Sequence, residues 1–301
     1  MSGEISALIS AFCYALSNLL LRKGQRDTLP ADNGLFPILF VSGTVLSFNL
    51  VMDLIDDPAP LVVGQHWGKN VLFCILAGVV ATLFGRLALY AAIARIGATR
   101  GITVIAMAPV VTLVIAVGLL GERIHYTDVI GIGLLSVGIV LLVVEATNRQ
   151  SRTARTWWRS GLVIAILAPV FQGIGYSFRK VGVTLPIDPI FASTLDTLAA
   201  LFTYFAVLRS RGRLRQYFRF YVRNVNLYLV TSGFVTAAAV FFFFDAVSAA
   251  PVSTVSVIIG SQPVILAILS GIFLRKAEQL TWMTVASAAV VSAGVSFIGW
   301  H

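Results

Sequence analysis

Ten apolar stretches recur along the chain and constrain its fold more than any other feature of the sequence. Each is roughly 18–25 residues long, which as an α-helix is enough to cross the ~30 Å hydrocarbon core of a bilayer. They are continuously apolar and too long for the strands of a membrane barrel. The stretches cover residues 4–21, 35–55, 70–94, 98–120, 128–146, 160–178, 189–208, 227–247, 249–273 and 281–300. The sequence therefore predicts an all-α membrane protein with ten transmembrane helices.

The chain also contains two copies of one sequence pattern. Residues 89–142 align with residues 243–297, so that Pro109 overlies Pro263, 154 residues later. The alignment extends upstream with a slightly different offset. Its other matched positions include Arg22 with Arg179, Lys23 with Lys180, Asp32 with Asp188 and Thr127 with Thr281. Such internal duplication in a membrane chain is typical of transporters, whose substrate site lies between the repeats.

The duplication divides the chain into two units. We expect a first five-helix repeat over residues 1–147, a basic connector over 148–159 and a second five-helix repeat over 160–301. Because each repeat has an odd number of spans, the two copies are expected to lie in opposite orientations. The predicted architecture is thus two inverted repeats around a central cavity.

The net charge of +9 is concentrated in the loops and does not indicate a nucleic-acid partner. Most of the 22 lysines and arginines come after odd-numbered spans, at Arg22, Lys23, Arg26, Arg95, Arg100, Arg149, Arg152, Arg155, Arg159, Arg209, Arg211, Arg213, Arg215, Arg219, Arg223, Arg275 and Lys276. Basic loops remain in the cytoplasm. We therefore expect an integral protein of a prokaryotic plasma (inner) membrane whose odd-numbered loops are cytoplasmic. The basic, aromatic loop 209–226 is expected to touch membrane lipids.

The repeat unit resembles a known family. The duplicated five-helix unit, the matched prolines Pro109 and Pro263, and Gly121-Glu122 after the fourth stretch resemble the EamA branch of the drug/metabolite transporter superfamily. The second repeat departs from the Gly-Glu pattern, and its acidic residue, Glu278, is shifted. The resemblance implies a central cavity lined by the first four helices of each repeat. It also implies transport of small metabolites, often export, without an ATP-binding part.

Two ionisable residues inside the spans are candidates for substrate contact, because a charge in the membrane requires a partner or water. Arg86 shares a predicted helix face with Thr82 and Tyr90, and could hold a carboxylate or phosphate. Asp196 could hold an amine, a cation or a coupling proton. A structural role stays open for both, with Arg86 as a helix–helix partner and Asp196 as a buried carboxylate paired with Arg86.

Several polar residues in otherwise apolar spans are further candidates for lining the cavity. They are Tyr14, Asn18, Tyr90, Gln172, Tyr176, Ser261 and Gln262. Interhelical hydrogen bonding is the alternative role for such side chains. Pro109 and Pro263 each remove one backbone donor and are expected to kink their helices, as a pair of gates around one site.

The leading functional prediction is a secondary transporter that exports amino acids or related zwitterions by alternating access. Arg86 would take the anionic end, and Asp196 the cationic end or a proton. The alternatives are efflux of lipophilic cations or drugs, and a flippase for a lipid-linked phosphate or sugar. No enzyme, cofactor or metal site is expected, since the three histidines are not at metal-ligand spacing. A homodimer is possible, although a monomer suffices.

The charge distribution predicts the orientation of the chain. Basic loops after odd-numbered spans place both termini outside, opposite to the arrangement that the family resemblance implies. Reporter fusions at residues 150 and 215 measure this directly. Strong cytoplasmic reporter activity at both positions is expected, and strong periplasmic activity at both would reverse the assignment.

Overall fold

The computed structural model describes residues 2–29, 32–56, 67–120, 152–183, 187–273 and 282–297, together with parts of 126–141. All secondary structure in these residues is helical, and helices lie within every predicted apolar stretch. Six helices of the described chain are long and apolar enough to cross a membrane. They cover Gly3–Asp27, Leu35–Ile55, Trp67–Ile96, Ala98–Ile115, Pro189–Ser210 and Leu227–Ala249.

The helices of the first half are mostly short segments of longer spans. They are α1 (Gly3–Gly24), η1 (Gln25–Asp27), α2 (Leu35–Asp56), α3 (Trp67–Ala77), η2 (Gly78–Gly85), α4 (Arg86–Ile96), α5 (Ala98–Ile105) and α6 (Ala108–Leu120). The second half contains α8 (Arg152–Gly182), α9 (Pro189–Ser210), α10 (Leu214–Arg223), α11 (Leu227–Ala249), α12 (Val252–Gly260), α13 (Gln262–Phe273) and α14 (Trp282–Phe297).

α8 includes part of the predicted connector. The sequence predicts a polar link that includes residues 152–159, but α8 already begins at Arg152. This segment has no glycine or proline before Gly161 that would interrupt a helix. Residues 148–151 of the connector, and the paired acidic positions Glu122 and Glu278, lie outside the described residues.

Equivalent aspartates begin the second helix of each half. The Asp188 carboxylate accepts a hydrogen bond from the backbone N–H of Ile190 at 2.7 Å, and Pro189 occupies the first turn of α9. Asp32 accepts from the backbone N–H of Phe36 at 2.9 Å at the start of α2. Both satisfy a backbone donor that a helix end leaves free. The aligned pair Asp32 and Asp188 thus has the same local role in both halves.

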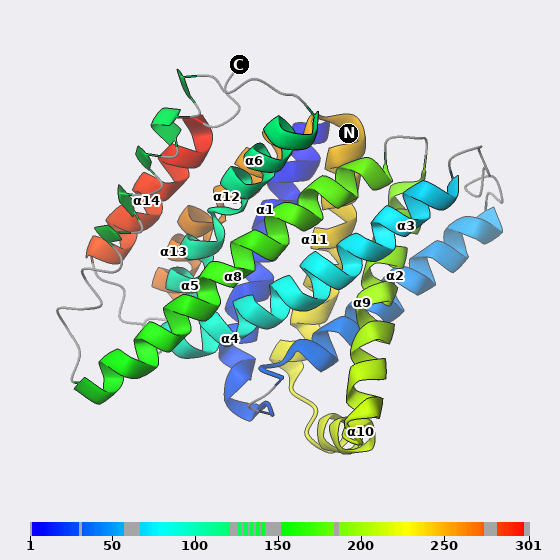
Figure 1. The fold of residues 1–301 in the computed structure, drawn as a ribbon. Coiled ribbons are helices and arrows are strands. Elements are labelled where there is room, and N and C mark those ends of the chain that lie inside the picture. Colours follow the sequence, from blue (N-terminus) through cyan, green and yellow to red (C-terminus); the bar gives the residue numbers. More distant parts are fainter. Residues whose placement is uncertain are drawn as a thin grey trace.

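The packing pairs equivalent helices of the two halves. α1 packs along α11, while α8 packs along α3, η2 and α4. Under the sequence alignment, α8 corresponds to α1, and the span α3–η2–α4 corresponds to α11. α2 packs against α9, its own equivalent. Figure 1 shows α8 running diagonally beside α4 and α3, with α1 and α11 behind them.

Small residues allow α1 and α11 to approach closely. An added Cβ atom at Gly3 of α1 would collide with Ala250 at the end of α11. The Ser10 hydroxyl donates to the carbonyl of Ala239 at 2.8 Å, and Ser17 lies 2.6 Å from the hydroxyl of Thr236. Small residues and interhelical hydrogen bonds are the usual means of helix association in membranes.

The third span contains a π-helical segment, η2, that its sequence did not predict. The backbone N–H of Arg86 donates to the carbonyl of Ala81, five residues earlier, as well as to that of Leu83. A π-helical turn holds more residues than an α-helical turn, so it rotates the helix before it relative to the helix after it. Thr82 therefore faces α9 and does not share the face of Arg86 and Tyr90, which corrects the predicted stripe.

Regular helical hydrogen bonding is interrupted just before the proline in each of the two proline-containing spans. α5 ends at Ile105 and α6 begins at Ala108, so Pro109 lies in the first turn of α6. In the same way α12 ends at Gly260 and Pro263 lies in the first turn of α13. Proline is tolerated in a first turn because no intrahelical acceptor is needed there. Ala106 and Ser261 keep right-handed helical backbone angles, so each span continues through a short turn at the position where its proline predicts a kink.

Glycine at position 78 allows η2 to touch α9. A Cβ atom at Gly78 would collide with the backbone carbonyl of Asp196. We expect Gly78→Ala to destabilise the protein by about 1–3 kcal/mol, because the crowded backbone of α9 must shift. The comparison is made by thermal unfolding in detergent. Gly68→Ala is the matched control, since a Cβ atom there meets nothing within 4 Å, and an equal effect in both variants would contradict the close contact.

Candidate functional site

Most of the predicted substrate-contacting residues line one cleft between the two halves. The cleft has an empty volume of ≈ 420 Å³, including the space open to its surroundings. Its walls come from α1, α4, α5, α8, α11 and α13. The lining consists of Tyr14, Ser17, Asn18, Arg86, Leu89, Tyr90, Ile105, Gln172, Tyr176, Thr236 and Gln262. We call this set the central cleft.

Arg86 is the charged residue of the central cleft, at the beginning of α4. Its side chain is only 4% exposed, yet neither Nη1 nor Nη2 has a hydrogen-bond partner in the described part of the chain. The guanidinium lies over the ring of Tyr14, with 5.8 Å between its central carbon and the ring centroid. A buried cation with two unpaired nitrogens is costly. An anionic group that entered the cleft would supply the missing acceptors, and a carboxylate fits the two nitrogens.

The two helix breaks face each other beside the central cleft. A second cleft, of ≈ 230 Å³ empty volume, is lined from both breaks by Ile102, Ile105, Ala106, Ala108, Pro109, Tyr176, Ser256, Ile259, Gly260, Gln262 and Pro263. Ile105, Tyr176 and Gln262 belong to both clefts, so the two are neighbours. Helix ends carry unpaired backbone groups, with partial positive charge at the N-terminus and partial negative charge at the C-terminus.

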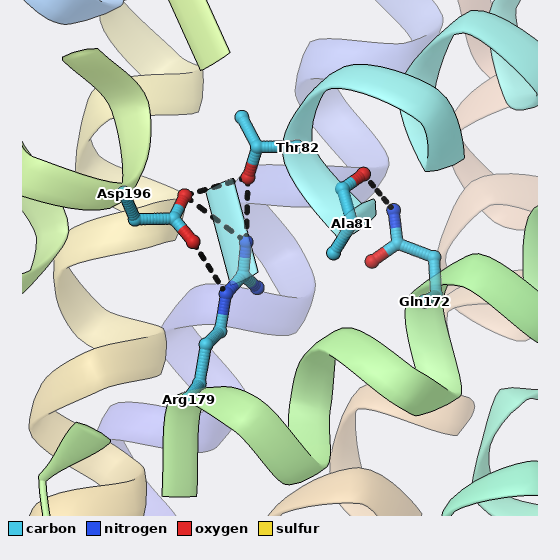
Figure 2. Close-up of polar contacts among 5 residues, drawn as sticks. All are labelled: Ala81, Thr82, Gln172, Arg179 and Asp196. Carbon is cyan, nitrogen blue, oxygen red and sulfur yellow. Dashed lines mark hydrogen bonds and ion pairs between the residues drawn. The ribbon is translucent and has the colours of Figure 1, made fainter. Parts of the chain in front are cut away.

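Asp196 lies in a buried ion pair and is not among the lining residues of the central cleft (Figure 2). Its Oδ1 is 3.1 Å from Nε of Arg179, and its Oδ2 is 3.3 Å from Nη2. The Thr82 hydroxyl donates to Oδ2 at 2.6 Å and accepts from Nη2 of Arg179 at 2.7 Å. This network joins η2, α8 and α9. It corrects the placement of Asp196 in the cavity and also replaces Arg86 by Arg179 as its partner.

Arg179 is deeply buried, although the apolar pattern predicts that it borders a loop. α8 continues to Gly182, beyond the expected end at residue 178, so Arg179 is only 1% exposed. Its guanidinium lies 4.9 Å from the ring centroid of Phe243 and 5.5 Å from that of Phe244. One feature of the sequence indicates this burial. The spacing of Arg179 from Gln172 and Tyr176 places the three residues along one side of a helix.

Two other predicted residues donate hydrogen bonds to backbone carbonyls. The Ser261 hydroxyl donates to the carbonyl of Ile258 at 2.7 Å, and Ser261 lines neither of the two clefts. Gln172 does line the central cleft, while its amide nitrogen donates to the carbonyl of Ala81 at 3.4 Å across to η2 (Figure 2). Ser17, Leu89 and Thr236 were not predicted as lining residues, since hydroxyl and leucine side chains are common in packed spans.

The whole chain has counterparts among known proteins. The sequence model of the EamA-like transporter family matches residues 1–144 and 159–300. This chain belongs to the EamA-like transporter family. The family assignment and the apolar helices make it an integral membrane protein of the transporter class. The two matched ranges of this EamA-like transporter also fit a duplicated chain.

The fold of the EamA-like transporter occurs in solved structures. Twenty-eight chains match, among them one described only as "Crystal structure of protein". That structure has a TM-score of 0.60 at 15% sequence identity, over 97% of this chain and 96% of the other. At this identity the likeness concerns the fold alone. No curated protein matches the sequence.

The Arg179–Asp196 pair is expected to stabilise the EamA-like transporter without contacting substrate. Asp196→Asn and Arg179→Met should each cost about 3–5 kcal/mol, because each leaves one buried charge without its partner. The double variant should recover much of that loss, as measured by thermal unfolding of the four proteins in a double-mutant cycle. Strictly additive effects would show that the two charges act separately.

Proposed function

We propose that this EamA-like transporter is a secondary transporter that exports small polar metabolites, with amino acids or related zwitterions as the leading class. The observation that carries the proposal is the buried guanidinium of Arg86 in the central cleft, with two nitrogens that lack partners among the described residues. A cation whose nitrogens lack partners among the described residues favours substrates that bring an anionic group. The cleft also contains tyrosine and amide side chains that can orient a small polar molecule.

The architecture we propose is ten transmembrane helices arranged as two inverted five-helix repeats, in a prokaryotic plasma membrane. Three observations support it. Equivalent helices make equivalent packing contacts, α1 with α11 and α8 with α3–η2–α4. Asp32 and Asp188 begin equivalent helices. The helix breaks before Pro109 and Pro263 occur at matching positions.

In this proposal Arg86 binds the substrate carboxylate, while oxygen acceptors bind the ammonium group. The sequence favours Asp196 for the ammonium group or for a coupling proton, but its pairing with Arg179 favours a structural role. In place of Asp196, the ammonium group can be bound by the amide oxygens of Gln172 and Gln262 and the hydroxyl of Tyr176. The α5 break beside Ile105 adds the partial negative charge of a helix C-terminus.

Alternating access would use the two broken helices. Backbone groups freed inside a membrane protein are tolerated where protein or cavity water satisfies them. Because both breaks line one cleft, a change in one half-helix alters the wall that the other half-helix contacts. We propose that Pro109 and Pro263 allow these segments to move as a pair of gates on either side of the central cleft.

The test is transport by the purified protein in proteoliposomes, screened with labelled amino acids, with and without an imposed proton gradient. We expect Arg86→Gln to weaken transport of the accepted substrate by about 10- to 100-fold, the loss of a charged hydrogen-bond pair. Arg86→Lys should recover activity only partly, since the planar fork is lost. Thermal unfolding should change little in either variant.

Arg26→Gln is the matched control, because Arg26 is exposed and outside both clefts. It should leave transport unchanged. An Arg86→Gln variant that transports normally would remove the proposed anion contact. An Arg86→Gln protein that unfolds far below the wild type would instead assign Arg86 a structural role.

A further inference from the structure

The short helix α10 is held across the end of α9 by aromatic packing. It joins α9 to α11, two helices that can each span a membrane. It therefore lies where α9 ends and α11 begins (Figure 1). Tyr217 and Tyr221 are its buried residues. Phe36 of α2 stacks on the ring of Tyr221 at 5.8 Å and meets Phe218 edge-on at 5.0 Å.

A buried carboxylate also fixes α10. Asp32 is fully buried and accepts hydrogen bonds from the hydroxyl of Tyr221 at 2.5 Å and from that of Tyr204 at 2.8 Å. Burial raises the pKa of Asp32 above its usual value, while the hydrogen bonds from both tyrosines oppose this rise. Asn226, just after α10, donates to the carboxylate of Asp27 at 2.9 Å. α10 is thus part of the packed structure and not a loosely attached surface helix.

An apolar groove runs between α10, α2 and the start of α11. Its empty volume is ≈ 740 Å³, including the space open to its surroundings. The lining is almost entirely apolar and consists of Phe36, Pro37, Phe40, Val41, Phe218, Tyr221, Val222, Asn224, Val225, Asn226, Leu229 and Val230. Val222 and Val225 are 73% and 72% exposed, and Phe40 is 42% exposed. We call this feature the α10 groove.

A row of arginines borders the α10 groove. Arg215, Arg219 and Arg223 repeat at spacing four along α10, and all three are exposed. At 100° per residue, this row lies next to the face that carries Phe218 and Val222. In the part of the chain that the structure describes, these arginines make no ion pair. The sequence has no acidic residue between Asp196 and Asp245, and the nearby Asp27 carboxylate accepts a hydrogen bond from Asn226.

We propose that the α10 groove binds one acyl chain of an anionic phospholipid, whose phosphate is held by Arg215, Arg219 and Arg223. The groove has apolar walls where the spans α9 and α11 are joined. The arginines of the neighbouring α10 row can form bidentate hydrogen bonds with a phosphate there. Phe40, on the spanning helix α2, forms part of the wall, so the groove meets the lipid phase directly. A lipid fits this combination of apolar wall and unpaired cations better than a soluble protein segment does.

This site is independent of the transported substrate, because it shares no residue with either of the two clefts. Its occupant would link α2, α10 and α11, helices that belong to both halves. Occupancy is therefore expected to raise the temperature at which the purified protein unfolds, with the increase growing as the logarithm of the anionic lipid concentration once the site is mostly filled.

The experiment measures lipid binding to the full-length protein in detergent by native mass spectrometry and thermal unfolding. Phosphatidylglycerol and phosphatidylcholine with identical acyl chains are compared. We expect phosphatidylglycerol to bind at least about tenfold more tightly, from roughly 1 kcal/mol per arginine near a lipid surface. Glycerol phosphate, which has the charge but no chains, should not compete. Equal binding of the two lipids, or full competition by glycerol phosphate, would overturn the proposal.

Two variants and a matched control locate the site. The triple variant Arg215→Gln, Arg219→Gln, Arg223→Gln should lose the preference for phosphatidylglycerol. Val222→Trp should weaken binding of both lipids by filling the groove. The control Arg209→Gln, Arg211→Gln, Arg213→Gln removes the same charge from outside α10 and should keep the preference.

Each alternative result is decisive. A preference that survives in the first triple variant, or that falls equally in the control, would mean that bulk charge attracts the lipid and that α10 forms no site. If the wild-type protein copurifies with an acidic protein and retains no lipid, the groove binds a protein partner and the lipid proposal is wrong. Unfolding measured without added lipid shows whether each variant is folded.

Discussion

The buried ion pair between Arg179 and Asp196 fixes α8, one wall of the central cleft, against its neighbours. It joins α8 to α9, and through Thr82 it also holds η2. In hydrocarbon neither charge could be left alone, so each fixes the position of the other. Gly78 allows the close approach of η2 to α9 on which this network depends. The position of Arg86, directly after η2, is set by the same contacts.

The two buried arginines illustrate how a membrane protein separates structural from binding charges. Arg179 has a carboxylate, a hydroxyl and two aromatic rings around it. Arg86 has an aromatic ring beside it but unpaired nitrogens in the described structure, and it faces a cleft. A cation that is fully satisfied resists change, whereas an unsatisfied cation responds to any anion that enters. The same residue type therefore stabilises the fold at one position and is available for a ligand at the other.

Much of this arrangement could be predicted from the sequence, because hydrocarbon imposes strong constraints on composition. The apolar stretches predicted where helices lie, and the matched prolines predicted where two spans break. The helical periodicity of polar residues predicted several that line one cleft, namely Tyr14, Asn18, Arg86, Gln172 and Tyr176. It failed for Thr82 and Asp196, since an α-helical period cannot reveal a π-helical turn or the partner that a distant helix supplies. The true end of α8, and hence the burial of Arg179, depended on packing against neighbouring helices.

The π-helical segment η2 also makes the direction of Arg86 depend on the number of residues before it. An α-helix that gains one residue must either rotate everything beyond the insertion by about 100° or absorb the residue in a wider turn. η2 is such a wider turn, and it lies directly before Arg86. Loss of a single residue between Gly78 and Gly85 would restore a regular helix and direct the guanidinium toward a different neighbour. The chemistry of the cleft can therefore change by the length of one turn, with every side chain of the cleft retained.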